Sequence, residues 1–332
     1  MKKILLLHTG GTFGMVTIKP DKVLTPGNLQ EELASHVPEL NQIADIDVQI
    51  PFNEDSANVG ISHWQQLAQT INSKMDDYDG FIVIHGTDTM VYTASAISFS
   101  LINLKKPVLF TSAQRPLSKL RSDARMNIID AVEVSTLDIN EVLIVFGQNI
   151  LRANRSRKSS RTSYDAFYSP NYPAIGSIGQ RVTVNFELTL HPDTKYKFID
   201  SFNSSMISIH IFPGCDPSLY DDALKNPEIH AILLIGFGIG NIPIKEKDWL
   251  TFIQKAKKAG KAVFINSSTA HGSIDLEVYE NGKKALDAGA IGCKDMTLEA
   301  TIVKVMKGLS LTRQPDQLKT FFLNPVAGEI EK

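Results

Sequence analysis

The sequence predicts an α/β protein with about two domains. Its first half alternates short apolar runs with amphipathic stretches, the pattern of a parallel sheet covered by helices. At 332 residues the chain has the length of about two domains. The alternation breaks off between residues 150 and 205 and resumes after Phe202. We therefore expect two sheet-containing domains with a boundary near residues 190–205.

Short apolar runs mark the expected strands. Most are nearly continuous in apolar residues, which is typical of strands that are buried on both faces. Residues Gln180–Leu190 alternate only weakly and suggest an edge strand or a hairpin. The other expected strands are Lys3–His8, Ile46–Phe52, Gly80–His85, Pro107–Thr111, Glu141–Phe146, Met206–Phe212, Ala231–Ile235 and Ala262–Asn266.

Helical periodicity predicts amphipathic helices between these strands. One stripe, at i, i+3, i+4 and i+7, consists of Trp64, Leu67, Ala68 and Ile71. Ser62 and Gln65, just before that stripe, predict a capping box. Further stripes are Met90, Ala94, Ile97 and Leu101, then Met126, Ile129, Ala131 and Val132, and finally Leu298, Ile302, Val305 and Leu309.

Composition argues against several classes of partner. The chain has 34 Lys and Arg against 36 Asp and Glu, a formal charge of -2, so nothing predicts binding to nucleic acid or an anionic membrane. No apolar run approaches the ~20 residues that cross a bilayer. Two cysteines, Cys215 and Cys293, make no disulfide framework, which favours a reducing compartment. We expect a cytoplasmic protein.

Two segments leave a predicted strand and enter a turn rich in glycine and threonine. The first is His8–Gly14 (His-Thr-Gly-Gly-Thr-Phe-Gly), and the second is His85–Thr89 (His-Gly-Thr-Asp-Thr). In open parallel sheets, ligands bind beyond the carboxyl ends of the strands. Glycines there allow sharp turns and bring backbone N–H donors close to a ligand. Threonine hydroxyls and a carboxylate are therefore expected at one rim of the sheet.

The residues alone leave other interpretations open. Thr87 and Asp88 suit helix N-caps, and taken alone their segment favours capping. The spacing Gly10-Gly11-x-x-Gly14 differs from the dinucleotide fingerprint, which weakens a nucleotide-binding α/β protein as an alternative. Lys158 lies in a basic run, 152–161, that is typical of a solvated loop, although a lysine can activate a threonine hydroxyl. The eight histidines show no metal-ligand spacing, so no metal is expected.

Several motifs resemble those of one enzyme family. Thr9-Gly10-Gly11-Thr12-x-Gly14 and His85-Gly86-Thr87-Asp88-Thr89-Met90 are similar to the two signatures of L-asparaginases. Further similar motifs follow in order along the whole chain, namely Asp77–Phe81, Leu120–Ala124, Asp165–Asn171 and Asp295–Thr301. The sequence is identified as a member of the L-asparaginase family and resembles its bacterial cytosolic (type I) branch.

The resemblance implies both a fold and an activity. The fold is a larger N-terminal mixed or parallel sheet domain with helices on both faces (residues 1–190), a linker (191–205) and a smaller C-terminal doubly wound parallel-sheet domain (206–332). The activity is hydrolysis of L-asparagine to L-aspartate and ammonia through a threonine acyl-enzyme, without a metal or organic cofactor. The family also implies a homodimer or a homotetramer built as a dimer of dimers.

The resemblance also implies roles for individual residues. Thr12 corresponds to the nucleophile, and Thr87, Asp88 and Lys158 to a second catalytic group that polarises a threonine or a water molecule. The resemblance further implies a set of residues that bind the two ends of asparagine, namely Gly11, Asp55, Ser56, Ala57, Gly86, Ala113 and Gln114.

The chain departs from the family at two places. Many members carry a tyrosine on the loop after the first signature, whereas residues 15–27 contain none, and we expect Tyr279 of a neighbouring subunit to replace it. The segment Asp55–Asn58 ends in asparagine where members more often have an acidic residue, which leaves substrate preference open. One alternative is therefore an amidohydrolase that prefers L-glutamine or supplies ammonia in the manner of an amidotransferase. Amidotransferase chains of this family usually carry an extra N-terminal domain, whereas this chain starts at its first strand. A second alternative is an inactive amino-acid-binding protein.

Overall fold

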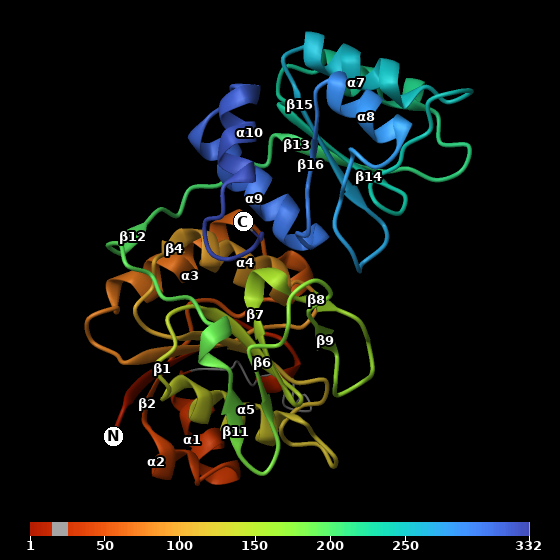
Figure 1. Cartoon of the computed structure of the whole chain (residues 1–332). Coiled ribbons are helices and arrows are strands. Elements are labelled where there is room, and N and C mark those ends of the chain that lie inside the picture. Colours follow the sequence, from red (N-terminus) through yellow and green to blue (C-terminus); the bar gives the residue numbers. More distant parts are fainter. Residues whose placement is uncertain (15–25, 332) are drawn as a thin grey trace. The chain divides into compact units, whose positions relative to one another are not determined.

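The structure is a computed structural model that describes residues 1–14 and 26–331. The chain divides into two compact units, Met1–Asp200 and Ser201–Lys332, each with its own sheet (Figure 1). The predicted α/β class is confirmed. The expectation for the loop 15–27 concerns mainly residues 15–25, which lie outside the described residues.

The first unit is built on a mixed eight-stranded sheet with the order β11-β10-β7-β6-β5-β3-β1-β2. Five neighbouring strands run parallel, namely β2 (Asp45–Gln49), β1 (Lys3–His8), β3 (Gly80–Ile84), β5 (Val108–Thr111) and β6 (Val142–Phe146). Three antiparallel strands extend the sheet beyond β6, namely β7 (Asn149–Arg152), β10 (Gly176–Ile178) and β11 (Val182–Val184). The carboxyl ends of the parallel strands therefore share one edge.

Helices cover both faces of this sheet, which explains why the central strands are apolar throughout. Alternate residues of β1 face opposite cores, so that Leu5 packs with one helix group and Leu6 with the other. The first group is α3 (Ile61–Ser73) and α4 (Met90–Ser100), and the second is α1 (Pro26–His36), α2 (Leu40–Ile43) and α5 (Ala124–Ser135). Burial of each large apolar side chain contributes about 1.5–3 kcal/mol, so the sheet forms a rigid base for the loops at its edge.

Short elements complete the first unit. Strand β4 (Leu101–Ile102) pairs with β12 (Lys197–Phe198), and β8 (Arg157–Lys158) pairs with β9 (Phe167–Tyr168). Single 3₁₀ turns follow several strands, namely η1 (Thr12–Gly14), η2 (Ser56–Asn58), η3 (Ala153–Arg155) and η4 (Phe186–Leu188).

The second unit contains a four-stranded, fully parallel sheet, as expected. Its strands lie in the order β13 (Met206–His210), β14 (Ala231–Gly236), β15 (Ala262–Ser267) and β16 (Ala290–Gly292). Figure 1 shows the larger helices on its two sides, α7 (Trp249–Lys258) with α8 (Glu280–Asp287) and α9 (Leu298–Leu311) with α10 (Pro315–Leu323). Two short elements, η5 (Pro217–Tyr220) and α6 (Asp221–Lys225), connect β13 to β14.

Some local predictions are wrong. The capping box predicted at Ser62 and Gln65 is wrong because α3 begins at Ile61, so Ser62 already lies inside the helix. His63 Nδ1 instead accepts the N–H of the N-cap residue Gly60 at 3.2 Å. The stripe predicted from Met126 to Val132 is right only in part, since Ala131 and Val132 are buried but Met126 is 56% exposed. The buried face of α5 begins instead with Ala124 and Ile128.

Three further observations concern strands and membrane spans. Strand β2 ends at Gln49, two residues before Pro51, which has no N–H to offer a neighbouring strand. The weakly alternating segment 180–190 contains β11, which is the edge strand of the sheet and makes a hairpin with β10, so the prediction of an edge strand or hairpin is confirmed; the segment then turns into η4. No helix within residues 1–14 and 26–331 combines the length and the apolar character needed to cross a bilayer.

Candidate active site

The two glycine- and threonine-rich turns leave neighbouring parallel strands. Strands β1 and β3 pair in register, with His8 opposite Ile84, so their following turns begin side by side. The Thr9 N–H donates to the Ile84 carbonyl at 2.9 Å, and the Thr9 hydroxyl donates to the same oxygen at 3.0 Å. The two predicted signature turns are therefore joined at their base.

Glycines bring these turns into direct backbone contact. A Cβ atom on Gly11 would lie 2.5 Å from Gly86 Cα, and Gly11 also adopts a left-handed φ of +85°. A Cβ on Gly86 would lie 2.6 Å from the Cβ of Ser56. Only glycine tolerates such approaches. Thr12 and Thr87 each follow one of the two contacting glycines, and the Ser56 segment packs against the second turn.

Lys158 reaches the second turn from far along the chain. Its Nζ donates to Thr87 Oγ1 at 2.8 Å and forms an ion pair with Asp88 Oδ1 at 2.6 Å. The Lys158 side chain is only 17% exposed, whereas that of Asp88 is 70% exposed. Thr87 and Asp88 thus contact a lysine rather than cap α4, whose N-cap residue is Thr89. The interpretation of both residues as simple helix caps is wrong.

A buried ionic network supports the strand that carries Lys158. Arg152 Nε donates to Glu141 Oε2 at 2.6 Å, and both side chains are almost fully buried. The guanidinium carbons of Arg152 and Arg155 lie 4.4 and 5.1 Å from the ring centroid of Tyr172. The run 152–161 is therefore not simply a solvated loop. Sequence reasoning missed this network, because no local pattern shows that these arginines point inward.

The segment predicted to hold the charged end of the substrate forms the turn η2. Asp55 Oδ1 accepts the Ala57 N–H at 3.0 Å and so caps this turn. Ser56 is buried, and its side chain fills the space above Gly86. The Glu54 N–H donates to the Thr9 carbonyl at 3.1 Å, which links the segment to the first turn as well.

Ala113 and Gln114 follow β5 in a loop that is held by a buried carboxylate. Asp123 accepts the Gln114 N–H at 3.0 and 2.9 Å through its two oxygens, and Oδ1 also accepts the Arg115 N–H at 3.0 Å. The Leu117 N–H donates to the Phe13 carbonyl at 3.4 Å, which connects this loop to the first turn. Sequence reasoning did not assign Asp123 a role, although it lies in one of the family-like motifs.

Two buried histidines lie at the ends of strands beneath these turns: His8 is the last residue of β1, and His85 directly follows β3. Burial lowers the pKa of His8 to about 4, with a smaller contribution from nearby His85. Burial likewise lowers the pKa of His85 to about 4. Both side chains are therefore neutral at pH 7. His85 Nδ1 lies 2.8 Å from the Gly86 carbonyl oxygen, and since that oxygen can only accept, Nδ1 carries the proton.

Tyr279 lies in the second unit, directly before α8, and its side chain is 54% exposed. Its expected role involves a neighbouring subunit and stays a prediction.

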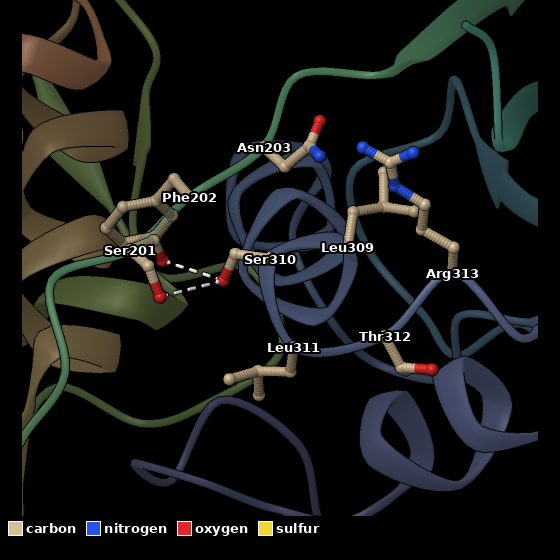
Figure 2. Close-up of a pocket in the computed structure, with 8 residues that line it drawn as sticks. All are labelled: Ser201, Phe202, Asn203, Leu309, Ser310, Leu311, Thr312 and Arg313. Carbon is tan, nitrogen blue, oxygen red and sulfur yellow. Dashed lines mark hydrogen bonds between the residues drawn. The ribbon is translucent and has the colours of Figure 1, made fainter.

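Within the described part of the chain, no group of three or more His, Cys, Asp or Glu residues is arranged to hold a metal ion. A shallow pocket in the second unit lies between residues 201–203 and the end of α9 (Figure 2). Two of its lining residues contact each other, since Ser310 Oγ donates to the Ser201 carbonyl at 2.9 Å. The lining residues include none of the predicted site residues, being Ser201, Phe202, Asn203, Leu309, Ser310, Leu311, Thr312 and Arg313.

The first unit thus defines an α/β protein with hydroxyl, ammonium and carboxylate groups gathered at the carboxyl edge of its sheet. Two family models match this chain. Residues 3–190 match the model described as Asparaginase, N-terminal, and residues 207–322 match the Glutaminase/Asparaginase C-terminal domain. The chain belongs to the asparaginase family, which confirms the resemblance found in the sequence.

Individual relatives match over the full length of the chain. It is 34% identical to L-asparaginase 1 of Escherichia coli K12, over 99% of this chain and 98% of that protein. The crystal structure of L-asparaginase I from Vibrio cholerae superposes with a TM-score of 0.90 at 32% identity, over 100% of this chain and 99% of the other. A glutamyl-tRNA(Gln) amidotransferase chain of Pyrococcus abyssi is 32% identical over 99% of this chain, which spans 77% of that protein.

Proposed function

We propose that this protein hydrolyses L-asparagine to L-aspartate and ammonia. The observation that carries the proposal is the contact of Lys158 with Thr87 and Asp88, next to the backbone contact of Gly11 with Gly86. A solvated lysine would not need two protein partners at 2.6–2.8 Å, one of them a half-buried hydroxyl.

Thr12 is the nucleophile of the first step. Its Oγ1 attacks the carbonyl carbon of the side-chain amide, the C–N bond breaks, and the nitrogen leaves as ammonia with the hydroxyl proton of Thr12. An aspartyl ester on Thr12 remains. Water then attacks this ester, gives one proton back to the threonine oxygen and releases L-aspartate. Dividing hydrolysis in this way replaces one difficult step by two easier ones.

Thr87, Lys158 and Asp88 form the second catalytic group. The Lys158 ammonium donates to Thr87 Oγ1, which leaves the proton of that hydroxyl available and stabilises negative charge on its oxygen. Asp88 holds the ammonium in place from the solvent side. The group can therefore polarise the attacking threonine or water. Backbone N–H groups near Gly11 and Thr87 stabilise the carbonyl oxygen as it gains charge, and one such donor contributes about 3–4 kcal/mol to lowering a barrier.

The remaining residues bind asparagine. Asp55, Ser56 and Ala57 hold its α-amino and α-carboxylate groups, while Gly86, Ala113 and Gln114 line the amide end. Fixing the charged end brings the amide carbon within attack distance of the hydroxyl.

The same proposal covers the assembly. The N-terminal domain carries both threonines and Lys158, and the C-terminal domain supplies Tyr279 to a neighbouring subunit of a homodimer or homotetramer. Cys215 and Cys293 are both free, which supports a reducing, cytoplasmic location.

Ammonia release from asparagine and from glutamine, measured side by side, tests the activity. We expect turnover of asparagine, and we expect Thr12→Ala and Thr87→Val each to remove nearly all of it while the melting temperature stays within a few degrees. Faster turnover of glutamine would instead favour the glutaminase or ammonia-supplying alternative. Binding of aspartate without turnover of either amide would favour an inactive binding protein.

A further inference from the structure

Thr89 occupies the N-cap position of α4 but does not cap the helix. A threonine at this position ordinarily accepts a hydrogen bond from a backbone N–H of the first turn. The Thr89 side chain makes no such bond. Its hydroxyl instead donates to the Ser56 carbonyl at 2.6 Å, across 33 positions of sequence. Helix α4 therefore has no side-chain cap, and the Thr89 hydroxyl links the second signature turn to the Ser56 segment.

The segment that receives this bond has little regular structure. Turn η2 is three residues long and follows β2 without belonging to the sheet. The Ser56 carbonyl also accepts the Val59 N–H at 3.2 Å, but that bond is local to the turn. The Ser56 side chain packs on Gly86, and such packing does not fix direction. The hydrogen bond donated by the Thr89 hydroxyl is therefore a directional link between η2 and the second signature turn.

Thr87 and Thr89 lie on the same turn with different partners. Thr87 contacts Lys158, and Thr89 contacts the Ser56 segment. One short stretch of backbone thus connects the Thr87 hydroxyl of the proposed second catalytic group to the segment proposed to hold the charged end of the substrate. The distance between the Thr87 hydroxyl and the Ser56 segment sets how long an amino-acid side chain must be for its amide to reach the catalytic hydroxyls.

We propose that Thr89 is a positioning residue: its hydroxyl holds the Asp55–Ala57 segment at the distance from Thr87 that asparagine requires. The inference rests on the proposed function, because it takes Asp55–Ala57 as the site of the substrate's α-amino and α-carboxylate groups. Without the bond, the segment samples displaced positions, and substrate binding must restore the competent one. Such a conformational cost weakens apparent affinity and leaves the bound complex unchanged.

The test uses a substitution of nearly equal shape. Thr89→Val removes the hydroxyl, and we expect the KM for asparagine to rise about fivefold, the factor that one neutral hydrogen bond contributes, while kcat stays within about threefold. Because the distance is less well fixed, the preference for asparagine over glutamine should fall as well. Thr89→Ser keeps the hydroxyl and should restore both values.

Thr93→Val is the matched control. Thr93 lies four residues further along in α4, is fully buried, and accepts the Trp64 Nε1–H at 3.2 Å. Its loss should lower the melting temperature without changing KM. The positioning role is contradicted if Thr89→Val leaves KM unchanged, if it changes KM no more than Thr93→Val does, or if Thr89→Ser fails to restore KM.

Calorimetric binding of L-aspartate separates this inference from the proposed function. If the wild-type protein turns over neither amide but Thr89→Val weakens aspartate binding about fivefold, the proposed function fails and the positioning role stands. If asparagine turnover is found and aspartate binds equally well to both proteins, the positioning role fails alone. A wild-type protein that neither binds aspartate nor turns over asparagine contradicts both.

Discussion

Replacing Lys158 by methionine addresses the centre of the candidate site. Methionine keeps an unbranched apolar side chain of similar length but removes the ammonium, and with it the bonds to Thr87 at 2.8 Å and to Asp88 at 2.6 Å. If Lys158 is catalytic, this change should act strongly on turnover and weakly on folding.

The structure sets the size of both effects. Asp88 is 70% exposed, so solvent screens the ion pair, and its loss should lower the free energy of unfolding by about 1 kcal/mol or less. Assistance to proton transfer by a positioned side chain contributes about 10²–10⁴-fold to a rate. At 1.36 kcal/mol per tenfold, this range corresponds to about 2.7–5.4 kcal/mol in the barrier. We expect kcat to fall at least 100-fold in a protein that remains folded.

The measurement is kcat from ammonia release, together with urea unfolding of the same preparations. Lys247→Met is a matched control, because Lys247 Nζ forms a similar ion pair with Asp216 Oδ2 at 2.5 Å in the second unit. It should change stability by a similar small amount and leave kcat unchanged. A Lys158→Met variant that keeps more than a tenth of the wild-type kcat, or one that loses activity only as it unfolds, contradicts a catalytic role.

Three further outcomes follow from the geometry. Gly11→Ala should abolish activity and lower the unfolding free energy by roughly 1–3 kcal/mol, because its Cβ would lie 2.5 Å from Gly86. Gly260→Ala, with φ of +71° but open space around it, should cost stability alone in the same urea and activity assays. Burial, with a smaller effect of Glu133, raises the pKa of Asp130 to about 6 from 3.8, so the contribution of Asp130 to stability falls as pH rises from 3.8 through 6. Asp130→Asn should therefore raise the melting temperature at pH 8 but not at pH 4, and an equal shift at both would contradict this. His8 and His85 have pKa values of about 4 in the folded protein against 6.5 when unfolded. Each should therefore lower the free energy of unfolding by about 3 kcal/mol as pH falls from 6.5 to 4, because the pKa values differ by 2.5 and each tenfold change corresponds to 1.36 kcal/mol. Urea unfolding of the Asp130→Asn variant across this pH range checks it without the opposing effect of Asp130, and a flat profile would show that the two histidines are not buried as neutral groups.

The central strands could be predicted because burial on both faces leaves a continuous apolar run. Strand β1 has the predicted bounds, and β3 ends within one residue of them. Short or polar strands gave no such signal. Strand β8 is Arg157–Lys158, and its pairing with β9 depends on contacts between residues that no local pattern connects. In α5 the apolar pattern marked the buried Ala131 and Val132 but misplaced the start of the stripe, because it counted the exposed Met126 and passed over the buried Ile128.

The turns of the candidate site could be located from the sequence, but their partners could not. Glycines after predicted strands indicate close backbone approach, and the structure supplies what they approach, namely Gly86 for Gly11 and Ser56 for Gly86. Lys158 could be assigned to the site only through the resemblance to the asparaginase family. From residue types alone its segment is indistinguishable from a solvated basic loop, because burial of a charged residue depends on a partner that is distant in sequence, here Glu141 for Arg152.

The basic segment 152–161 contains cations with two different roles, structural anchoring and the proposed catalysis. Arg152, Arg155 and Lys158 follow one another at intervals of three. The first two side chains are buried, against Glu141 and Tyr172, and the third is held by Thr87 and Asp88. Removing one partner of a buried ion pair costs about 3–5 kcal/mol, so an Arg152 variant would lose activity by displacing or unfolding the strand that carries Lys158. We therefore expect an Arg152 variant to lose both activity and stability. A Lys158 variant should lose activity but keep its stability. This contrast would show that Arg152 anchors the strand and that Lys158 takes part in the chemistry.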